Sequence, residues 1–499
     1  MRSSPLDSQR SGQPLFSRKT LSQVQTISAL LTLIVSSGCA SLQNQRPIDT
    51  KAAEGASGIV GPISGDWKEV RLVGDKKAYR TDLKNGLRVI LVPDRSSPTF
   101  AYQTWFNVGS RDEEIGKTGL AHLFEHLMFK GTKNHPTGEF EKRLDTAGAE
   151  GQNAFTSNDF TAYVQELPKE RLEMIVELES DRMTQLIVDE QLFKTEREVV
   201  QNERRQRTEN SPEGLMYQEM YELAFEKHPY RWPVIGYQKD LDSMSFRDAE
   251  DFYKSHYSPR SAVVIVTGDV ELDDTLKLIK KYYGRIGNPE LPPAAAIPME
   301  PKQATVRRKT LMLNMEVEKL FMAYKIPEAN HPDLIALSVL DGILSGGRSA
   351  RLPRALTDTG VTRTAWSHVA EGKDPGLFLV GATLQKGRKA VQAERMILSE
   401  IQRIRTQGVT QEEVDRTLNR LEFSYLEGLR TNKGLAEFIG ENELTYGNFE
   451  RGLQIYEAMR KVKPEEIKAV AMTYLNPEAR TVLLGIPKSS ASSSEKNPH

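Results

Sequence analysis

GLAHLFEHLMFKGT (residues 119–132) contains two of the chain's eight histidines, four residues apart, and a glutamate directly before the second. On a helix, residues i and i+4 are stacked neighbours, so His122 and His126 would present both imidazoles on one face, with Glu125 beside them. Zinc favours this set, because neutral imidazoles serve as ligands and a carboxylate can take the proton of a water. The alternative is a helix with polar residues on its solvent face, although H-x-x-E-H arises by chance on the order of one per cent of the time.

A catalytic zinc normally takes three protein ligands, so a third candidate is needed. The stretch QLFKTEREVVQNERRQR (191–207) predicts a strongly amphipathic helix, on which Glu196 and Glu203 are seven residues apart and share a face. A single glutamate in so charged a helix is more often solvated and loosely paired, as we expect for Glu198. The residues alone therefore leave the third ligand open.

Five segments, two of which overlap the stretches above, occur in this order along the chain: VGSRDEEIGKTGLAHLFEHLMFKGT, GQNAFTSNDFTAY, EREVVQNERRQR, HPYRWPVIGY and FYKSHYSPRSAVVIVTGDV. Their order resembles the pitrilysin family of inverted-motif zinc peptidases, to which mitochondrial processing peptidase and many short bacterial proteins belong. The resemblance covers roughly residues 70–487. In this family the H-x-x-E-H motif is followed by 76 residues and a glutamate, and the same count from His126 reaches Glu203.

The resemblance implies one zinc ion per chain, held by His122, His126 and Glu203, with Glu125 as the general base. It also implies a catalytic contribution from Glu196, which matches the family's further glutamate on the same helix. The implied activity is that of a zinc metalloendopeptidase that hydrolyses peptide bonds in unfolded or short peptides. The alternative is a non-catalytic structural or assembly subunit of the same fold, because some relatives have lost catalysis.

The stretch NAFTSND (153–159) resembles the family's strand beside the metal, on which an extended peptide adds as a further β-strand. The resemblance implies that Asn153, Ala154 and Phe155 line the bound peptide. For Phe155, packing in the core explains an aromatic residue equally well.

Short β-rich runs alternate with longer helical patterns along the body of the chain, which predicts an α+β fold. The runs of the second half repeat the order found in the first. We therefore expect two similar domains. The resemblance to the pitrilysin family implies that each is a mostly antiparallel sheet packed with helices, and that the two together form half of a clamshell. Composition divides the body into a catalytic zinc domain at 69–288, a linker rich in Pro and Ala at 289–306, a second domain at 307–487 and a disordered tail at 488–499.

The N-terminal 39 residues resemble an export signal, since basic residues precede the apolar run ISALLTLIV at 27–35. Cys39 is the chain's single cysteine and lies where a bacterial lipoprotein signal has its acylated cysteine. We therefore expect lipidation at Cys39, a flexible tether at 40–68, and a location on the periplasmic side of the bacterial cell envelope, with membrane contact only through the signal or lipid. A cleaved soluble form, an uncleaved anchor and a mitochondrial transit peptide are the alternatives, and the unbroken apolar run argues against the last.

The expected partners follow from charge and from one departure from the family. Lys plus Arg number 67 and Asp plus Glu 68, so the formal net charge of −1 gives no electrostatic basis for binding nucleic acid. In relatives that work alone, the second half carries an Arg and, seven residues on, a Tyr that contact the substrate opposite the zinc. Alignment on Gly360 places Leu356 and Arg363 at these positions, and the alternative is that Arg354 or Arg363 takes the role of the Arg. We therefore expect a heterodimer with a metal-free family member that supplies Arg and Tyr, a homodimer being the alternative.

Overall fold

The computed structural model describes residues 67–187, 189–290 and 296–488. Three predicted segments lie wholly or mostly outside this part of the chain: the signal with Cys39, the tether apart from its last two residues, and residues 489–499 of the tail. Among the residues it describes, no helix combines the length and the apolar character needed to cross a membrane.

The first sheet has seven strands in the order β1-β2-β3-β7-β4-β6-β5, and only the pairing of β3 with β7 is parallel. Every residue of β7 is buried, because this central strand is covered on both faces, and its sequence AVVIVTG is accordingly apolar except for Thr267. The strand β5 lies at one edge and has a single neighbour, β6. The strands are β1 (Lys68–Arg71), β2 (Lys77–Asp82), β3 (Arg88–Pro93), β4 (Thr99–Phe106), β5 (Glu150–Thr156), β6 (Thr161–Pro168) and β7 (Ala262–Gly268).

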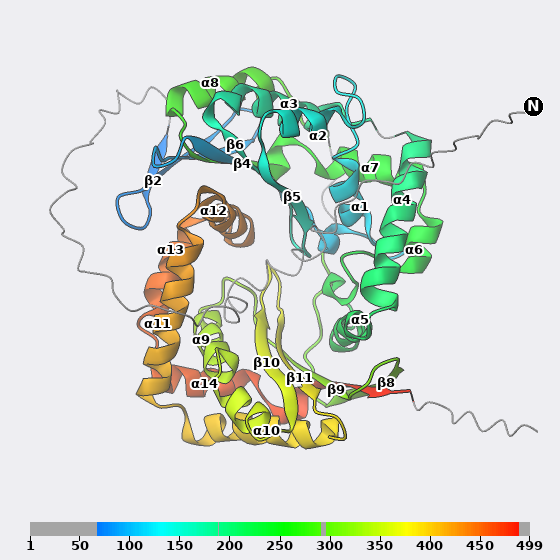
Figure 1. The fold of residues 1–499 in the computed structure, drawn as a ribbon, viewed down its shortest axis with the longest axis vertical. Coiled ribbons are helices and arrows are strands. Elements are labelled where there is room, and N and C mark those ends of the chain that lie inside the picture. The colour runs from blue at the N-terminus through cyan, green and yellow to red at the C-terminus, as the bar shows by residue number, and fades with distance from the viewer. Residues whose placement is uncertain (1–66, 188, 291–295, 489–499) are drawn as a thin grey trace, which may run out of the picture. The chain divides into compact units, whose positions relative to one another are not determined.

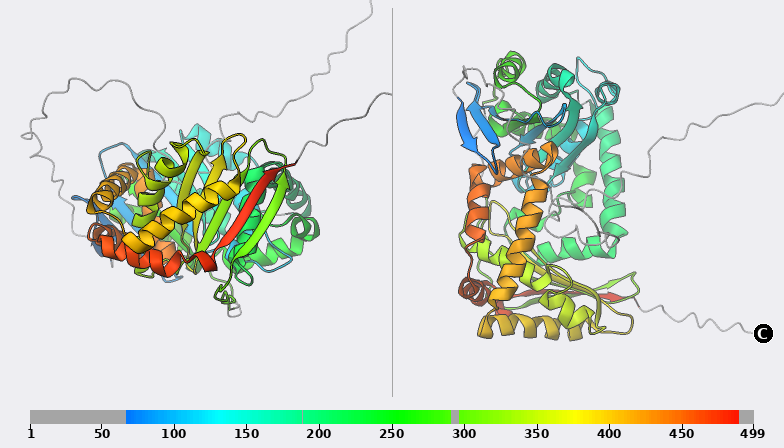
Figure 2. Two further views of the ribbon diagram at one scale, coloured as in Figure 1. Left: turned by 90° about the horizontal axis from the view of Figure 1, so that it is seen from below. Right: turned by 60° about the vertical axis from the view of Figure 1, so that its left-hand side comes forward.

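The second sheet has five strands in the order β10-β11-β9-β12-β8. Its single parallel pair is β8 with β12, which lie side by side (Figures 1 and 2). Order and strand sense match the segment β5-β6-β4-β7-β3 of the first sheet, so the prediction of two similar, mostly antiparallel sheets is confirmed. The strands are β8 (Arg307–Leu313), β9 (Lys319–Lys325), β10 (Thr362–Ala370), β11 (Leu377–Leu384) and β12 (Thr481–Pro487).

The described residues form fourteen α-helices, some of which pack on the sheets and others on neighbouring helices (Figure 1). Eight precede the second sheet: α1 (Leu120–Leu127), α2 (Glu139–Thr146), α3 (Leu172–Thr184), α4 (Glu190–Arg204), α5 (Pro212–Ala224), α6 (Gln238–Ser243), α7 (Phe246–His256) and α8 (Leu272–Tyr283). Six lie between β9 and β12 in the chain: α9 (Asp333–Ser345), α10 (Ala390–Gln407), α11 (Gln411–Gly428), α12 (Asn432–Tyr446), α13 (Glu450–Met459) and α14 (Pro464–Tyr474). Residues 286–290 and 296–306 contain no helix or strand. The domain limits predicted from composition remain a proposal.

The two sheets exchange helices. The helix α5 packs on β8, β9 and β12 of the second sheet, where Met216 and Met220 join an apolar cluster with Phe321. In return, α12 packs on β4 and β7 of the first sheet (Figure 1). Here Gly440 lies against Trp105, and a Cβ at this glycine would come within 2.2 Å of the indole ring. The exchange therefore gives the two halves of the chain a shared core.

Candidate metal centre

The helix α1 carries the H-x-x-E-H residues. Its apolar side chains pack into the core of the first sheet, which leaves the three polar side chains on the side towards α4 and β5. The buried carboxylate of Glu113 holds the start of the helix, because it accepts hydrogen bonds from the backbone N–H of Gly119 at 2.9 Å and of Ala121 at 2.8 Å. Gly119 has φ +98°, and a Cβ there would lie 2.7 Å from the carbonyl oxygen of Ile235, so glycine is required.

Three potential ligand atoms converge between α1 and α4. The Oε2 atom of Glu203 lies 3.3 Å from His126 Nε2 and 3.7 Å from His122 Nε2. The ligand atoms of these three residues all lie within 4.8 Å of one another, close enough to hold one metal ion. Atoms bound tetrahedrally to zinc at about 2.0–2.1 Å would be about 3.3 Å apart. The spacing from Glu203 to the two imidazoles is close to this value.

A second layer of side chains orients two of these groups. Glu196 accepts a hydrogen bond from His126 Nδ1 at 3.0 Å and pairs with Lys130 at 2.9 Å. The contact fixes the His126 tautomer with the proton on Nδ1, so that Nε2 is directed at the ligand cluster. Arg207 contacts Oε1 of Glu203 at 2.9 Å, which leaves Oε2 for the cluster.

The electrostatics of the cluster fit a cation. Burial lowers the pKa of His122. Burial also acts to lower the pKa of His126, but the bond to Glu196 and the nearby Glu203 outweigh it and raise this pKa to about 9. Burial acts to raise the pKa of Glu203, yet His126, His122 and Arg207 hold it at about 2. The carboxylate is thus ionised, and its Oε2 is buried without a hydrogen-bond partner among the described residues, as is Nδ1 of His122. An orphaned carboxylate oxygen aimed between two imidazoles suits zinc.

Glu125 is held by a residue of the edge strand β5. The hydroxyl of Thr156, the last residue of β5, donates a hydrogen bond of 2.7 Å to Glu125 Oε2. Asn153 is half-buried on the same edge strand, whereas Ala154 packs in the core of the first sheet and Phe155 is buried on the opposite face of that sheet. The ring of Phe155 packs edge-on against Trp105, with 5.3 Å between the ring centroids. Its side chain therefore serves in packing, the alternative that the sequence left open for this residue. At Ala154 and Phe155, the backbone rather than the side chain is therefore exposed at the free edge of β5.

The remaining residues singled out by the sequence lie elsewhere. Glu198 is exposed on α4, as expected for a solvated glutamate. Leu356 is fully buried in the core of the second sheet, and Arg363 is exposed on the edge strand β10. Neither belongs to the group that the structure brings together at α1 and α4.

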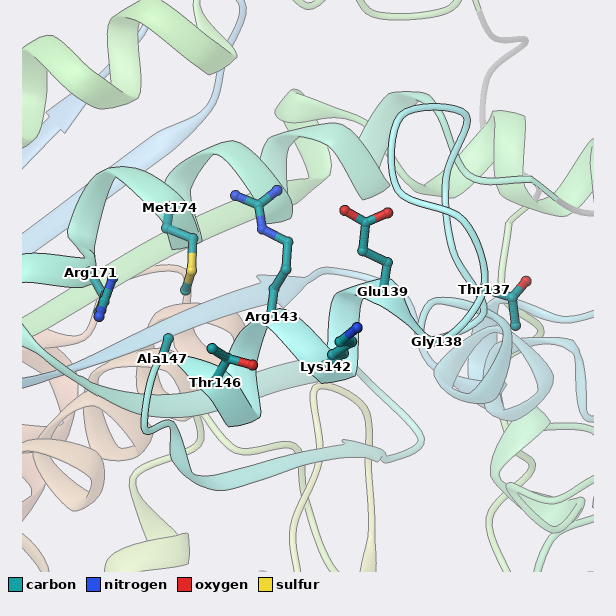
Figure 3. Close-up of a pocket in the computed structure, with 9 residues that line it drawn as sticks. All are labelled: Thr137, Gly138, Glu139, Lys142, Arg143, Thr146, Ala147, Arg171 and Met174. Atoms are coloured by element: carbon teal, nitrogen blue, oxygen red, sulfur yellow. The ribbon is translucent and has the colours of Figure 1, made fainter.

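A surface pocket lies between α2 and the start of α3 (Figure 3). One of its basic side chains, Arg143, contacts the ring of His135 at 3.1 Å and the carboxylate of Glu177 at 3.2 Å. The pocket is lined by Thr137, Gly138, Glu139, Lys142, Arg143, Thr146, Ala147, Arg171 and Met174. None of the candidate metal or substrate residues lines it, so it is separate from the proposed chemistry.

Comparison with known proteins places the chain in a family. Residues 88–237 match the family described as Insulinase (Peptidase family M16), and residues 243–421 match the Peptidase M16 inactive domain. The zinc protease PqqE of Helicobacter pylori is 32% identical over 415 residues, which cover 81% of this chain and 91% of that protein. The chain belongs to peptidase family M16, the pitrilysin family.

Other M16 relatives agree with this assignment. The probable mitochondrial-processing peptidase subunit beta of Arabidopsis thaliana is 25% identical over 409 residues, covering 79% of this chain and 76% of that protein. A protease from Helicobacter pylori shares the fold with a TM-score of 0.80 at 30% identity, and the match covers 83% of this chain and all of that one. The periplasmic protease PqqL of Escherichia coli, at 18% identity and a TM-score of 0.69, has the same fold over 84% of this chain and 49% of its own.

Sequence reasoning did not find several side chains that support this M16 site. Thr156 lies in a quoted segment but was not singled out, and Glu113, Lys130 and Arg207 carry no pattern of their own. Their roles depend on which elements the fold brings together. The nearest available signal was position, since Lys130 and Arg207 each follow a candidate ligand by four residues, one helical turn.

Proposed function

We propose that this M16 protein is a zinc-dependent endopeptidase that cleaves unfolded or short peptides. The observation that carries the proposal is the convergence of His122 Nε2, His126 Nε2 and Glu203 Oε2, with a carboxylate on the same helix face and an open strand edge beside it. The names of the relatives, among them zinc protease PqqE, support a zinc-dependent proteolytic function.

Each proposed role follows from position. His122, His126 and Glu203 hold the metal, and Glu196 keeps His126 in the tautomer that leaves Nε2 free. A zinc ion bound there supplies Lewis acidity, which polarises a carbonyl and lowers the pKa of water. Glu125 takes the proton of the attacking water and returns it to the leaving amine, while Thr156 fixes its carboxylate.

Substrate binding uses the edge of the first sheet. The strand β5 pairs only with β6, so the N–H and C=O groups on its other side are available to an extended peptide. A peptide added there would pass beside Glu125, because Thr156 of β5 contacts that carboxylate. Folded proteins present few such extended segments, which is why unfolded or short peptides are the proposed substrates.

A non-catalytic role is the second candidate, and one finding favours it. The family matched by residues 243–421 is described as an inactive domain. That match begins after the last candidate ligand, and the described second half contributes no residue to a candidate metal cluster. The first half retains the three ligands and Glu125, so we favour catalysis.

For location, we propose the periplasmic side of the cell envelope with a lipid anchor at Cys39. The apolar run at 27–35 and the single cysteine after it support this. Labelling with a radioactive fatty acid tests the anchor. Label should enter the wild-type protein and be lost in Cys39→Ser, and an unlabelled wild type would contradict the proposal.

For partners, we propose a heterodimer in which a metal-free family member supplies the Arg and Tyr opposite the zinc. The buried position of Leu356 supports this. Leu356 aligns with the family's Arg, and because its side chain is fully buried it cannot contact a peptide as that Arg does. A match to only 49% of PqqL is also consistent with two such units acting together.

Cleavage of a quenched, unstructured peptide by the purified chain tests the proposed activity, with Glu125→Gln as the blank. We expect cleavage that requires Glu125 and is abolished by a chelator, and that increases when a metal-free family member is added. Zinc binding without any cleavage, alone or with the partner, would favour the non-catalytic role. Full activity of the chain alone would contradict the heterodimer.

A further inference from the structure

A buried polar cluster joins the loop between β10 and β11 (residues 371–376) to the turn between β5 and β6 (residues 157–160). Asp159 is at its centre and is only 6% exposed. Its carboxylate accepts hydrogen bonds from the hydroxyl of Tyr230 at 2.8 and 2.9 Å and from the backbone N–H of Lys373 at 3.1 Å. Arg111 pairs with it at 3.2 Å.

Asp374 completes the connection from the side of the second sheet. Its carboxylate contacts Arg111 at 3.0 Å and His228 Nε2 at 3.0 Å, and its backbone N–H donates to the Tyr230 hydroxyl at 3.2 Å. The fit is close, since a Cβ at Gly372 would lie 2.3 Å from the Tyr230 oxygen. Tyr230 therefore both donates and accepts within the cluster and links the 371–376 loop to Asp159.

The 157–160 turn is directly connected to the proposed catalytic base. Ser157 and Phe160 close the turn through a backbone hydrogen bond of 2.8 Å, and the residue before it, Thr156, holds Glu125. Among the described strands β5 has one neighbour, β6, and its pairing is irregular between Glu150 and Asn153 but regular from Asn153 to Thr156. The C-terminal end of β5 therefore has support on one side from β6, and the contacts that hold the 157–160 turn also set its position.

We propose that Asp159 is a positioning residue, through which the 371–376 loop of the second half holds the end of β5 and thereby orients Glu125. The inference rests on the proposed peptidase function for its catalytic consequence. It gives the second half, which contributes no side chain to the described metal centre, a defined role in the active site. Loss of the cluster should misalign the base without removing any residue that touches the metal or the peptide.

Hydrogen–deuterium exchange of the full chain tests the structural link. Tyr230→Phe removes one hydroxyl, and Asp159→Asn removes one charge. Glu443→Gln is the matched control. Glu443 is a buried carboxylate on α12 that pairs with Arg80 at 3.3 Å and with Arg88, so it also links the two halves of the chain. Its partners lie on β2 and β3, far from β5 in the order of the sheet. We expect amides of 150–160 to exchange about tenfold faster in the first two variants and at the wild-type rate in the control.

Kinetics test the catalytic consequence. In Tyr230→Phe, kcat per bound zinc should fall about 10- to 100-fold while KM rises by a smaller factor, because β5 keeps its pairing with β6 but the base is misaligned. Wild-type exchange at 150–160 in both variants, or equal acceleration in Glu443→Gln, would overturn the inference. If wild type cleaves no peptide yet Tyr230→Phe accelerates exchange, the proposed function fails and the link between the halves stands.

Discussion

Replacement of Glu196 by Gln tests the layer behind the metal centre. Glu196 is 3% exposed, and its two oxygens face two donors, Nδ1 of His126 at 3.0 Å and Nζ of Lys130 at 2.9 Å. A glutamine has a single amide oxygen, so its NH₂ group would confront one of these donors. One hydrogen bond to a charged group is lost, at a cost of about 1.5–3 kcal/mol. If this loss reaches the metal through the orientation of His126, zinc affinity falls about 10- to 100-fold.

The assay is competition for zinc with a chromophoric chelator, which needs no catalytic turnover. Glu198→Gln is the matched control, because it removes the same charge from the same helix at an exposed position two residues away. We expect the control to bind zinc within about twofold of wild type. Wild-type affinity in Glu196→Gln, or an equal loss in the control, would refute the role of Glu196 in orienting His126.

Three further changes have defined outcomes. Thr156→Val removes the hydroxyl that holds the proposed base, and should lower kcat about tenfold at unchanged KM. Thr156→Ser keeps a hydroxyl and should restore kcat, so the same kcat in the Val and Ser variants would contradict this role. Glu113→Gln weakens the cap of α1 and should lower the free energy of unfolding by about 1–2 kcal/mol in urea titrations, whereas an unchanged midpoint would show that the cap is dispensable. Hydrogen bonds from Arg351 lower the pKa of Glu413 from 4.5 to about 2. The ion pair therefore stabilises the fold fully above pH 4.5, and this stabilisation is lost as the pH falls towards 2 and Glu413 becomes protonated. Glu413→Gln should cost roughly 1 kcal/mol at pH 7 and less at pH 3, and a pH-independent difference would be inconsistent with this.

The repeated sheet and the two histidines could be predicted because both are local features. The spacing of His122 and His126 fixes their shared helix face, and the order of strand-like and helical runs is the same in both halves. Glu203 was identified only by the family's count of intervening residues, since charge and periodicity made Glu196 an equal candidate.

The helix exchange and the polar cluster around Asp159 could not be predicted in the same way. Periodicity shows which face of α5 or α12 is apolar but not which sheet covers it. Asp159 and Lys373 are 214 residues apart, and nothing local in either segment indicates the contact. Such contacts are set by the packing of whole elements, which explains why the residues that support Glu125 were missed.

The most direct test of the proposed zinc site is an X-ray structure of the Glu125→Gln protein with zinc and an extended peptide, using anomalous scattering at the zinc edge. The account predicts one zinc ion ligated by His122 Nε2, His126 Nε2 and Glu203 Oε2, with the peptide paired along β5. Zinc at another position, with Glu203 turned away from the histidines, or a peptide bound away from β5, would contradict it.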